Sequence, residues 1–311
     1  MFARRRLLLG SVILSIAACR TPGSFTPRTD GVDVRNTLEP LVQAVRAAPD
    51  DRTAGEAWSK YLAEGGMPAD GVKPEALGKA IRASLPQLES ISASGPSEVR
   101  EVASAVGALH GRSVKARVSL EALREDVPVL KKIHLSDGQA PVALDWRRGG
   151  AAVDEEPGVL FLNARSPATA DPQARRALLA REMSAWLLPD ADSLSPLASV
   201  VYFRSVSAAA ALSISPGTHL DDDPKLRARL PLLARELLAS LDSAAPSQVG
   251  RFFGAAPSDP LLPRGSGAFL CEELGAALTS DLGSAEKVVR LTPGEFRRHA
   301  SQALQRLSSA P

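Results

Sequence analysis

The apolar residues of this 311-residue chain recur mostly at the spacing of a helix, and this pattern limits the fold more than any other feature. Within residues 36–47, Leu38, Leu41, Val42 and Val45 lie on one helical face. The same spacing predicts further helices over 52–64, 74–85, 97–109, 120–133, 172–188, 194–212, 224–240, 266–282 and 292–307. Much of the apolar 44% is alanine, which favours helix.

Only two short runs have the pattern of a strand. Residues 141–146 and 158–163 are continuous apolar stretches next to turn-forming residues, and they could pair as a hairpin with a long loop. The predicted fold class is therefore α+β and predominantly helical, with a small β-hairpin or sheet packed on helices. We expect a helical N-terminal part over 34–135 and a second domain over 136–311.

The first 18 residues have the pattern of an export signal. Three arginines at 4–6 precede an apolar run over 7–18, which is too short to be a stable spanning helix. Small residues lead into Cys19, and in this respect the segment resembles a bacterial lipoprotein signal peptide. The resemblance implies that Cys19 becomes the new N-terminus and carries lipid such as palmitate. An uncleaved anchor or an ordinary secretory signal are the alternatives.

A lipid on Cys19 would make the membrane the first partner of the chain. Residues 19–33 are rich in Pro, Gly, Thr and Ser, which predicts a flexible tether between the lipid and the folded part. Arg20 is not the aspartate that hints at the inner membrane, so the expected location is the cell envelope, at the outer rather than the inner membrane.

Composition excludes several classes of function. The formal charge of +2 includes the three signal arginines, so 34 basic and 35 acidic residues remain without them. With aromatic residues at 4% and no basic stripe, the chain is not expected to bind nucleic acid. Cys271, the second of two cysteines, lies in an apolar run and is expected to be a buried thiol rather than part of a disulfide.

The helix expected over 172–188 has the layout of a protease helix without its metal ligands. In a zincin peptidase, two histidines at positions i and i+4 bind zinc, and a glutamate directly after the first histidine is the general base. Here Arg181 occupies the first ligand position, Glu182 occupies the position of the base, and Ala185 occupies the second ligand position.

This helix resembles that of a gluzincin-like family of predicted bacterial zinc-dependent proteases, and the resemblance spans residues 140–305 or so. It implies a zincin-like domain in which 159–163 is the edge strand that helps to bind peptide substrate. It also implies that Ser205 stands where the family has a third ligand, a glutamate on the next helix. Other segments in the family's order are 213–217, 264–269, 274–275 and 291–296, although the family's tyrosine is missing.

The departures from the family remove its chemistry. Catalytic zinc needs three protein ligands and an open position, whereas arginine keeps its proton, alanine has no donor atom and serine is a poor ligand. We therefore expect no metal, no cofactor and no catalytic residue. Arg181, Glu182, Ala185 and Ser205 are interpreted as a degenerate site.

The expected function is that of a lipid-anchored envelope protein whose inactive protease-like scaffold has a non-catalytic binding or structural role. A peptide could add to the edge at 159–163, and Arg181 could pair with a carboxylate such as a peptide C-terminus. Two alternatives stay open. One is a residual metal-dependent peptidase that uses Glu182, and the other is an unrelated helical structural lipoprotein, because the same residues also fit an ordinary amphipathic helix.

Other chemical groups give weaker signals. The acidic clusters at 155–156 and 221–223 are expected to be solvated loop charges, since neither has the spacing of a calcium loop. The three tryptophans are expected to be core anchors, and the histidines are scattered without a pair at i and i+4: Trp58, Trp146, Trp186, His110, His134, His219 and His299.

Overall fold

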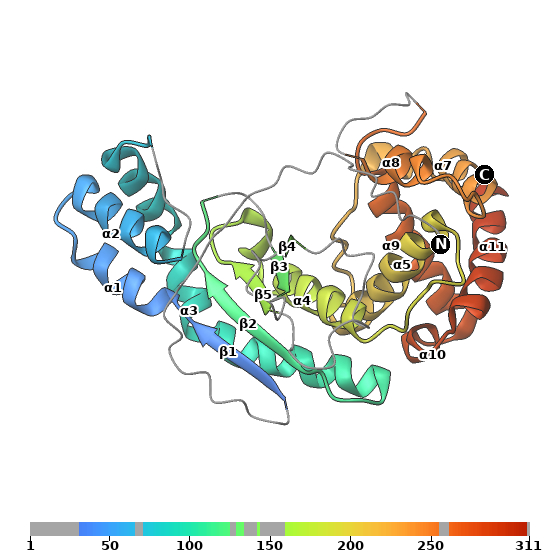
Figure 1. Cartoon of the computed structure of the whole chain (residues 1–311), viewed down its shortest axis with the longest axis horizontal. Coiled ribbons are helices and arrows are strands. Elements are labelled where there is room, and N and C mark those ends of the chain that lie inside the picture. Colours follow the sequence, from blue (N-terminus) through green and yellow to red (C-terminus); the bar gives the residue numbers. More distant parts are fainter. Residues whose placement is uncertain are drawn as a thin grey trace, which may run out of the picture.

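The computed structural model describes residues 31–65, 71–124, 129–133, 142–143, 159–254 and 261–309. These residues form a mostly helical fold with one small sheet, which confirms the predicted α+β class (Figure 1). The predicted signal, Cys19 and most of the tether lie outside the described residues, as do Trp146, His134 and the acidic pair at 155–156.

The sheet has five strands in the order β1-β2-β5-β3-β4. β1, β2 and β5 are parallel, whereas β3 is antiparallel to both β5 and β4. The strands are β1 (Val32–Asn36), β2 (Ala116–Glu121), β3 (Val129–Ile133), β4 (Val142–Ala143) and β5 (Val159–Asn163). The predicted division at residue 136 falls inside this sheet, because β1, β2 and β3 precede it and β4 and β5 follow it.

Three predictions about the strands are wrong. The predicted tether contains the first residues of β1, and the predicted helix over 120–133 is replaced by the end of β2 and by β3. The predicted hairpin does not form either, because β4 pairs with β3 rather than with β5. The parallel strands β1 and β2 are too short and too distant from each other in sequence for a local pattern to reveal their pairing.

The helices agree better with the sequence. They are α1 (Leu38–Ala47), α2 (Asp51–Glu64), α3 (Pro74–His110), α4 (Pro172–Trp186), α5 (Pro196–Ile214), α6 (Pro224–Arg227), α7 (Leu230–Ser240), α8 (Ser247–Phe253), α9 (Ser266–Leu282), α10 (Ala285–Val289) and α11 (Pro293–Ser309). Side-chain caps begin two of them: the Asp171 side chain accepts the N–H of Ala174 at the start of α4, and Thr292 and Glu295 form a capping box at the start of α11. The predicted helix over 224–240 is divided into α6 and α7.

The helices predicted over 74–85 and 97–109 form one continuous helix. α3 is a 37-residue helix that continues through Pro86 and Pro96. Because Pro96 has no N–H, it leaves the carbonyl of Ser92 without its helical partner, and the side-chain amide of Asn36 donates to that carbonyl at 2.8 Å. At the same place Gly95 lets α3 approach the sheet, since a Cβ there would lie 2.8 Å from Leu120 Cδ1.

The buried apolar side chains form two clusters. One joins α1, α2, α3, the sheet and α4, and the other joins α5 with α7, α8, α9, α10 and α11. Helix α5 is long and apolar enough to cross a membrane, with a mean hydropathy of 1.5, but 72% of that segment is buried in the fold, as expected for a core helix.

Helices α2 and α3 cross at very short distance. A Cβ added to Gly78 would lie 1.6 Å from the backbone oxygen of Asp51, and one added to Gly55 would lie 1.8 Å from that of Pro74. Since main-chain atoms cannot yield as a side chain can, the crossing requires glycine on both helices.

We predict that Gly78→Ala lowers the free energy of unfolding by about 1–3 kcal/mol or more, because the helices must separate to admit the methyl group. Urea unfolding followed by circular dichroism measures the change. Gly250→Ala is the matched control: it is in α8 with no atom within 4 Å of its Cβ, and it should leave stability unchanged or raise it by up to about 1 kcal/mol. Equal effects of the two substitutions would contradict the close crossing.

Candidate functional site

The residues of the predicted degenerate site lie on α4 and on α5, the helix that packs against it. α5 packs against α4 on one side and α9 on the other. Arg181, Glu182 and Ala185 are half-buried on α4, whereas Ser205 on α5 is fully buried.

Arg181 is held by a carboxylate of its own chain. Its Nη1 lies 2.8 Å from Oδ2 of Asp221, in the segment between α5 and α6, and its Nε lies 3.7 Å from Oε1 of Glu182. The side chains of Arg181 and Asp221 are 22% and 28% exposed, so solvent only partly screens the pair. Although Arg181 and Glu182 are neighbours in sequence, their opposite charges do approach each other.

Glu272 of α9 clamps the segment that carries Asp221. Its two carboxylate oxygens accept the backbone N–H groups of Leu220 at 3.1 Å and Asp221 at 2.8 Å. The Nδ1 atom of His219 lies 2.8 Å from Oε1 of the same carboxylate. Burial raises the pKa of Glu272, while the hydrogen bond from Asp221 opposes that rise. Glu272 directly follows the apolar run 269–271 in the sequence. A carboxylate at such a buried position needs hydrogen-bond partners, and this is the signal that could have revealed it.

Ser205, at the position predicted for a third ligand, is enclosed between helices. Ser205 lies at the crossing of α5 and α9, where a Cβ on Gly275 would come within 2.5 Å of the Ser205 carbonyl oxygen. Cys271 of α9 lies beside it, which confirms the predicted buried thiol. Burial raises the pKa of Cys271 to about 12, although the nearby Arg204 guanidinium and the Ser205 side chain lower it. Such a thiol stays protonated and is not a nucleophile.

Arg204 is a member of this region that the sequence analysis missed. It is half-buried on α5, and its guanidinium carbon lies 5.2 Å from the centre of the Phe253 ring. Burial lowers the pKa of Arg204, and the positive charge of Arg181 lowers it further. The carboxylates of Asp221 and Glu182 have the opposite effect. The signal that could have revealed Arg204 is that it is the one charged residue within 196–214.

The described residues hold no group of three or more His, Cys, Asp and Glu side chains arranged to bind a metal ion. Asp222 pairs with Arg227 at 2.9 Å, and Asp223 caps α6 by accepting the N–H of Lys225. The acidic run at 221–223 is thus used in three separate structural contacts. The prediction that these residues are solvated loop charges is correct only for Asp222, which is exposed.

The predicted peptide-binding edge is wrong. β5 is an interior strand, since it pairs with β2 on one side and with β3 on the other. Its backbone groups are used in those ladders, so no peptide can add along 159–163 without displacing a strand.

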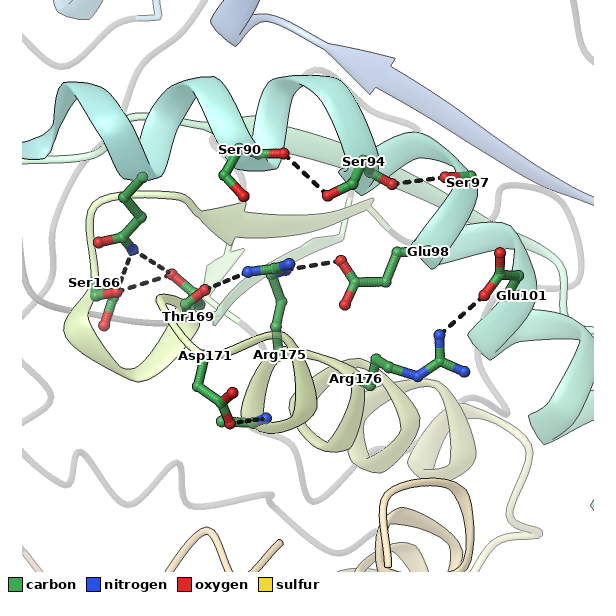
Figure 2. A network of polar contacts seen from close by, with 12 residues as sticks. Ser90, Ser94, Ser97, Glu98, Glu101, Ser166, Thr169, Asp171, Arg175 and Arg176 are labelled. Atoms are coloured by element: carbon green, nitrogen blue, oxygen red, sulfur yellow. Dashed lines mark hydrogen bonds and ion pairs between the residues drawn. The ribbon is translucent and has the colours of Figure 1, made fainter.

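A second polar network ties α4 to α3, and Figure 2 shows it. Arg175 is fully buried; its Nε donates to Glu98 at 2.8 Å and its Nη1 donates to the carbonyl of Thr169 at 2.7 Å. The Thr169 hydroxyl in turn donates to the carbonyl of Asn163, at the end of β5. This network joins three elements and has no opening to solvent, so we interpret it as structural.

No protein-family model, curated protein or solved structure matches this chain. Around Arg181 the side chains alternate in charge, since the carboxylates of Glu182 and Asp221 both approach its guanidinium. This arrangement joins α4 to the segment between α5 and α6 and, through Glu272, to α9.

We predict that Arg175→Met lowers the free energy of unfolding by about 3–5 kcal/mol, because it leaves the Glu98 carboxylate buried without its cation. Chemical denaturation measures the loss. Arg176→Met is the control on the next residue: it removes an exposed pair with Glu101 and should cost about 1 kcal/mol or less. Replacing both partners, Arg175→Met with Glu98→Leu, should restore much of the stability. Equal losses for Arg175→Met and Arg176→Met would contradict the account.

His110, the last residue of α3, gives a pH-dependent prediction. Its Nε2 lies 2.8 Å from the Ser184 hydroxyl, and burial, with Arg112 and Arg290 adding to it, lowers the pKa of His110 from 6.5 to about 4. Between these two values the unfolded chain binds a proton that the folded chain does not, so stability falls as the pH falls. We predict that the urea midpoint drops less between neutral pH and about pH 5 in His110→Gln than in the native chain. Identical drops would show that His110 is not buried in its neutral form.

Proposed function

We propose that this chain is a lipid-anchored protein of the bacterial cell envelope with a non-catalytic, protease-like scaffold. One observation carries the proposal: at the position of a zinc ligand the chain has Arg181, and that arginine is engaged by Asp221 at 2.8 Å. A guanidinium stays charged throughout the physiological pH range and repels a divalent cation from the place that the ligand would occupy.

The rest of the site supports the same conclusion. Ala185 supplies no donor atom, and Ser205 is buried beneath α9 out of reach of a substrate. Glu182 keeps the position of a general base, but without metal it has no water of lowered pKa to activate, and the neighbouring guanidinium lies 3.7 Å away. The zincin-like fold is likewise proposed, from the order and spacing of residues in the sequence.

The membrane anchor is proposed from the sequence. Small residues precede Cys19, and the chain between Cys19 and the first strand is short and polar. Each methylene buried in a bilayer contributes about 0.8 kcal/mol, so two or three acyl chains would hold the protein at the membrane without a spanning helix. The proposed location is the envelope, at the outer rather than the inner membrane.

The non-catalytic role is structural or consists in binding a partner. Since β5 is enclosed by β2 and β3, binding must use another surface than the predicted one. Asp221 also takes the place beside the Arg181 guanidinium that the carboxylate of a bound peptide would have occupied.

The test uses the mature protein purified from membranes. We expect no hydrolysis of a quenched fluorescent peptide library above background, with or without added zinc, and no change on Glu182→Gln. Intact mass should show Cys19 as the acylated first residue, and Cys19→Ser should abolish acylation. Zinc-dependent cleavage that is lost on Glu182→Gln would establish the residual peptidase instead, and an unmodified Cys19 in the mature chain would refute the anchor.

A further inference from the structure

A pocket opens beside the first residues of β1. It has a volume of about 670 Å³ and lies between the start of β1, the second half of α3 and the turn over 111–114 that leads to β2. Buried Ala103 and Val114 line it, together with Arg100, Arg112 and Asp33. This volume is within the range of ligand clefts in proteins, about 300–1,000 Å³.

The strand next to the pocket is the end of the sheet. Among the described residues β1 pairs only with β2, and Figure 1 shows it at the outer side of the sheet with α3 alongside. Val32, Asp33 and Val34 make no backbone hydrogen bond with a described residue outside β2. Such an edge presents a row of N–H and C=O groups that can accept another extended chain.

The charge of the pocket is mainly positive. Arg100 and Arg112 are exposed, and neither forms an ion pair with any residue that the structure describes. A third guanidinium, that of Arg290, lies 3.4 Å from the position of a Cβ on Gly111, although it also pairs with Glu286. Asp33 supplies one opposing carboxylate.

We propose that the β1 edge and this pocket bind an extended peptide whose acidic C-terminal end enters the pocket. An antiparallel strand added to β1 would place its carboxyl end beside the first residues of β1, where Arg100 and Arg112 lie. Guanidinium groups form strong, bidentate hydrogen bonds with carboxylates, so they select a free C-terminus or an acidic side chain. The strand edge supplies affinity through the main chain, and the arginines supply specificity.

The strand edge is the reason for choosing a peptide over an anionic lipid headgroup, because a headgroup needs the arginines but not the strand. The competing occupant within the chain itself is the segment over 20–30, which leads into β1 at this pocket. The inference rests on the proposed non-catalytic role, since it supplies that role with a class of partner.

The experiment selects from a library of random hexapeptides with free C-termini on the immobilised mature protein, and then measures fluorescence anisotropy with the selected peptides. We expect enrichment of acidic C-terminal residues, and binding that weakens by about tenfold or more when the peptide carboxylate is amidated. Backbone N-methylation should weaken binding at alternate peptide positions only, which is the signature of a paired strand.

The decisive variant is Arg100→Glu with Arg112→Glu, which should lose binding by about tenfold or more while its circular dichroism is unchanged, since both residues are exposed. The matched control is Arg235→Glu with Arg298→Glu, two exposed arginines of α7 and α11 with the same change in charge, and it should bind as the native protein does.

Four outcomes would overturn the inference: no enrichment over an empty support, equal binding by both double variants, binding only to phosphatidylglycerol vesicles, or peptide binding only after residues 20–30 are replaced by a Gly-Ser linker. Mass spectrometry of the bound peptides distinguishes a failure of the docking site from a failure of the proposed non-catalytic function. Cleaved peptides would refute the non-catalytic role and leave the docking site intact, whereas intact peptides that bind elsewhere would refute the docking site alone.

Discussion

The buried ion pair between Glu98 and Arg175 is the interaction on which the position of α4 depends. It lies between α3 and α4, with both side chains almost completely removed from solvent. α3 is itself held to the sheet where Pro96 frees the Ser92 carbonyl for Asn36. The sheet therefore positions α3, and α3 positions α4. Arg181, less than two helical turns beyond Arg175, is then presented to Asp221.

A second ion pair, between Arg181 and Asp221, lies at the predicted degenerate site. Where a zincin would use ligands to join two helices through a metal ion, this chain uses Arg181, Asp221 and Glu272 to join α4, the segment before α6 and α9. A metal centre keeps one position open for water or substrate. In this chain Asp221 pairs with Arg181, and Glu272 accepts two backbone N–H groups.

The sequence predicted the helices well and the sheet poorly, for a physical reason. A helix is specified by neighbours three and four residues apart, so α4 and α11 were recognisable from their apolar spacing and their caps. The pairing of β1 with β2 joins residues about 84 positions apart, such as Val32 and Ala116, and no local pattern records it. The site followed the same rule. Arg181 and Glu182 were found by their spacing on one helix, whereas Asp221 and Glu272 approach them only through tertiary packing.

Anomalous diffraction at the zinc edge, from crystals of the chain grown with excess zinc, tests the central claim most directly. The account predicts no zinc peak among Arg181, Glu182, Ala185 and Ser205, with the Arg181 guanidinium still within hydrogen-bond distance of the Asp221 carboxylate. A zinc peak bound by Glu182, with the guanidinium of Arg181 turned away from Asp221, would contradict it.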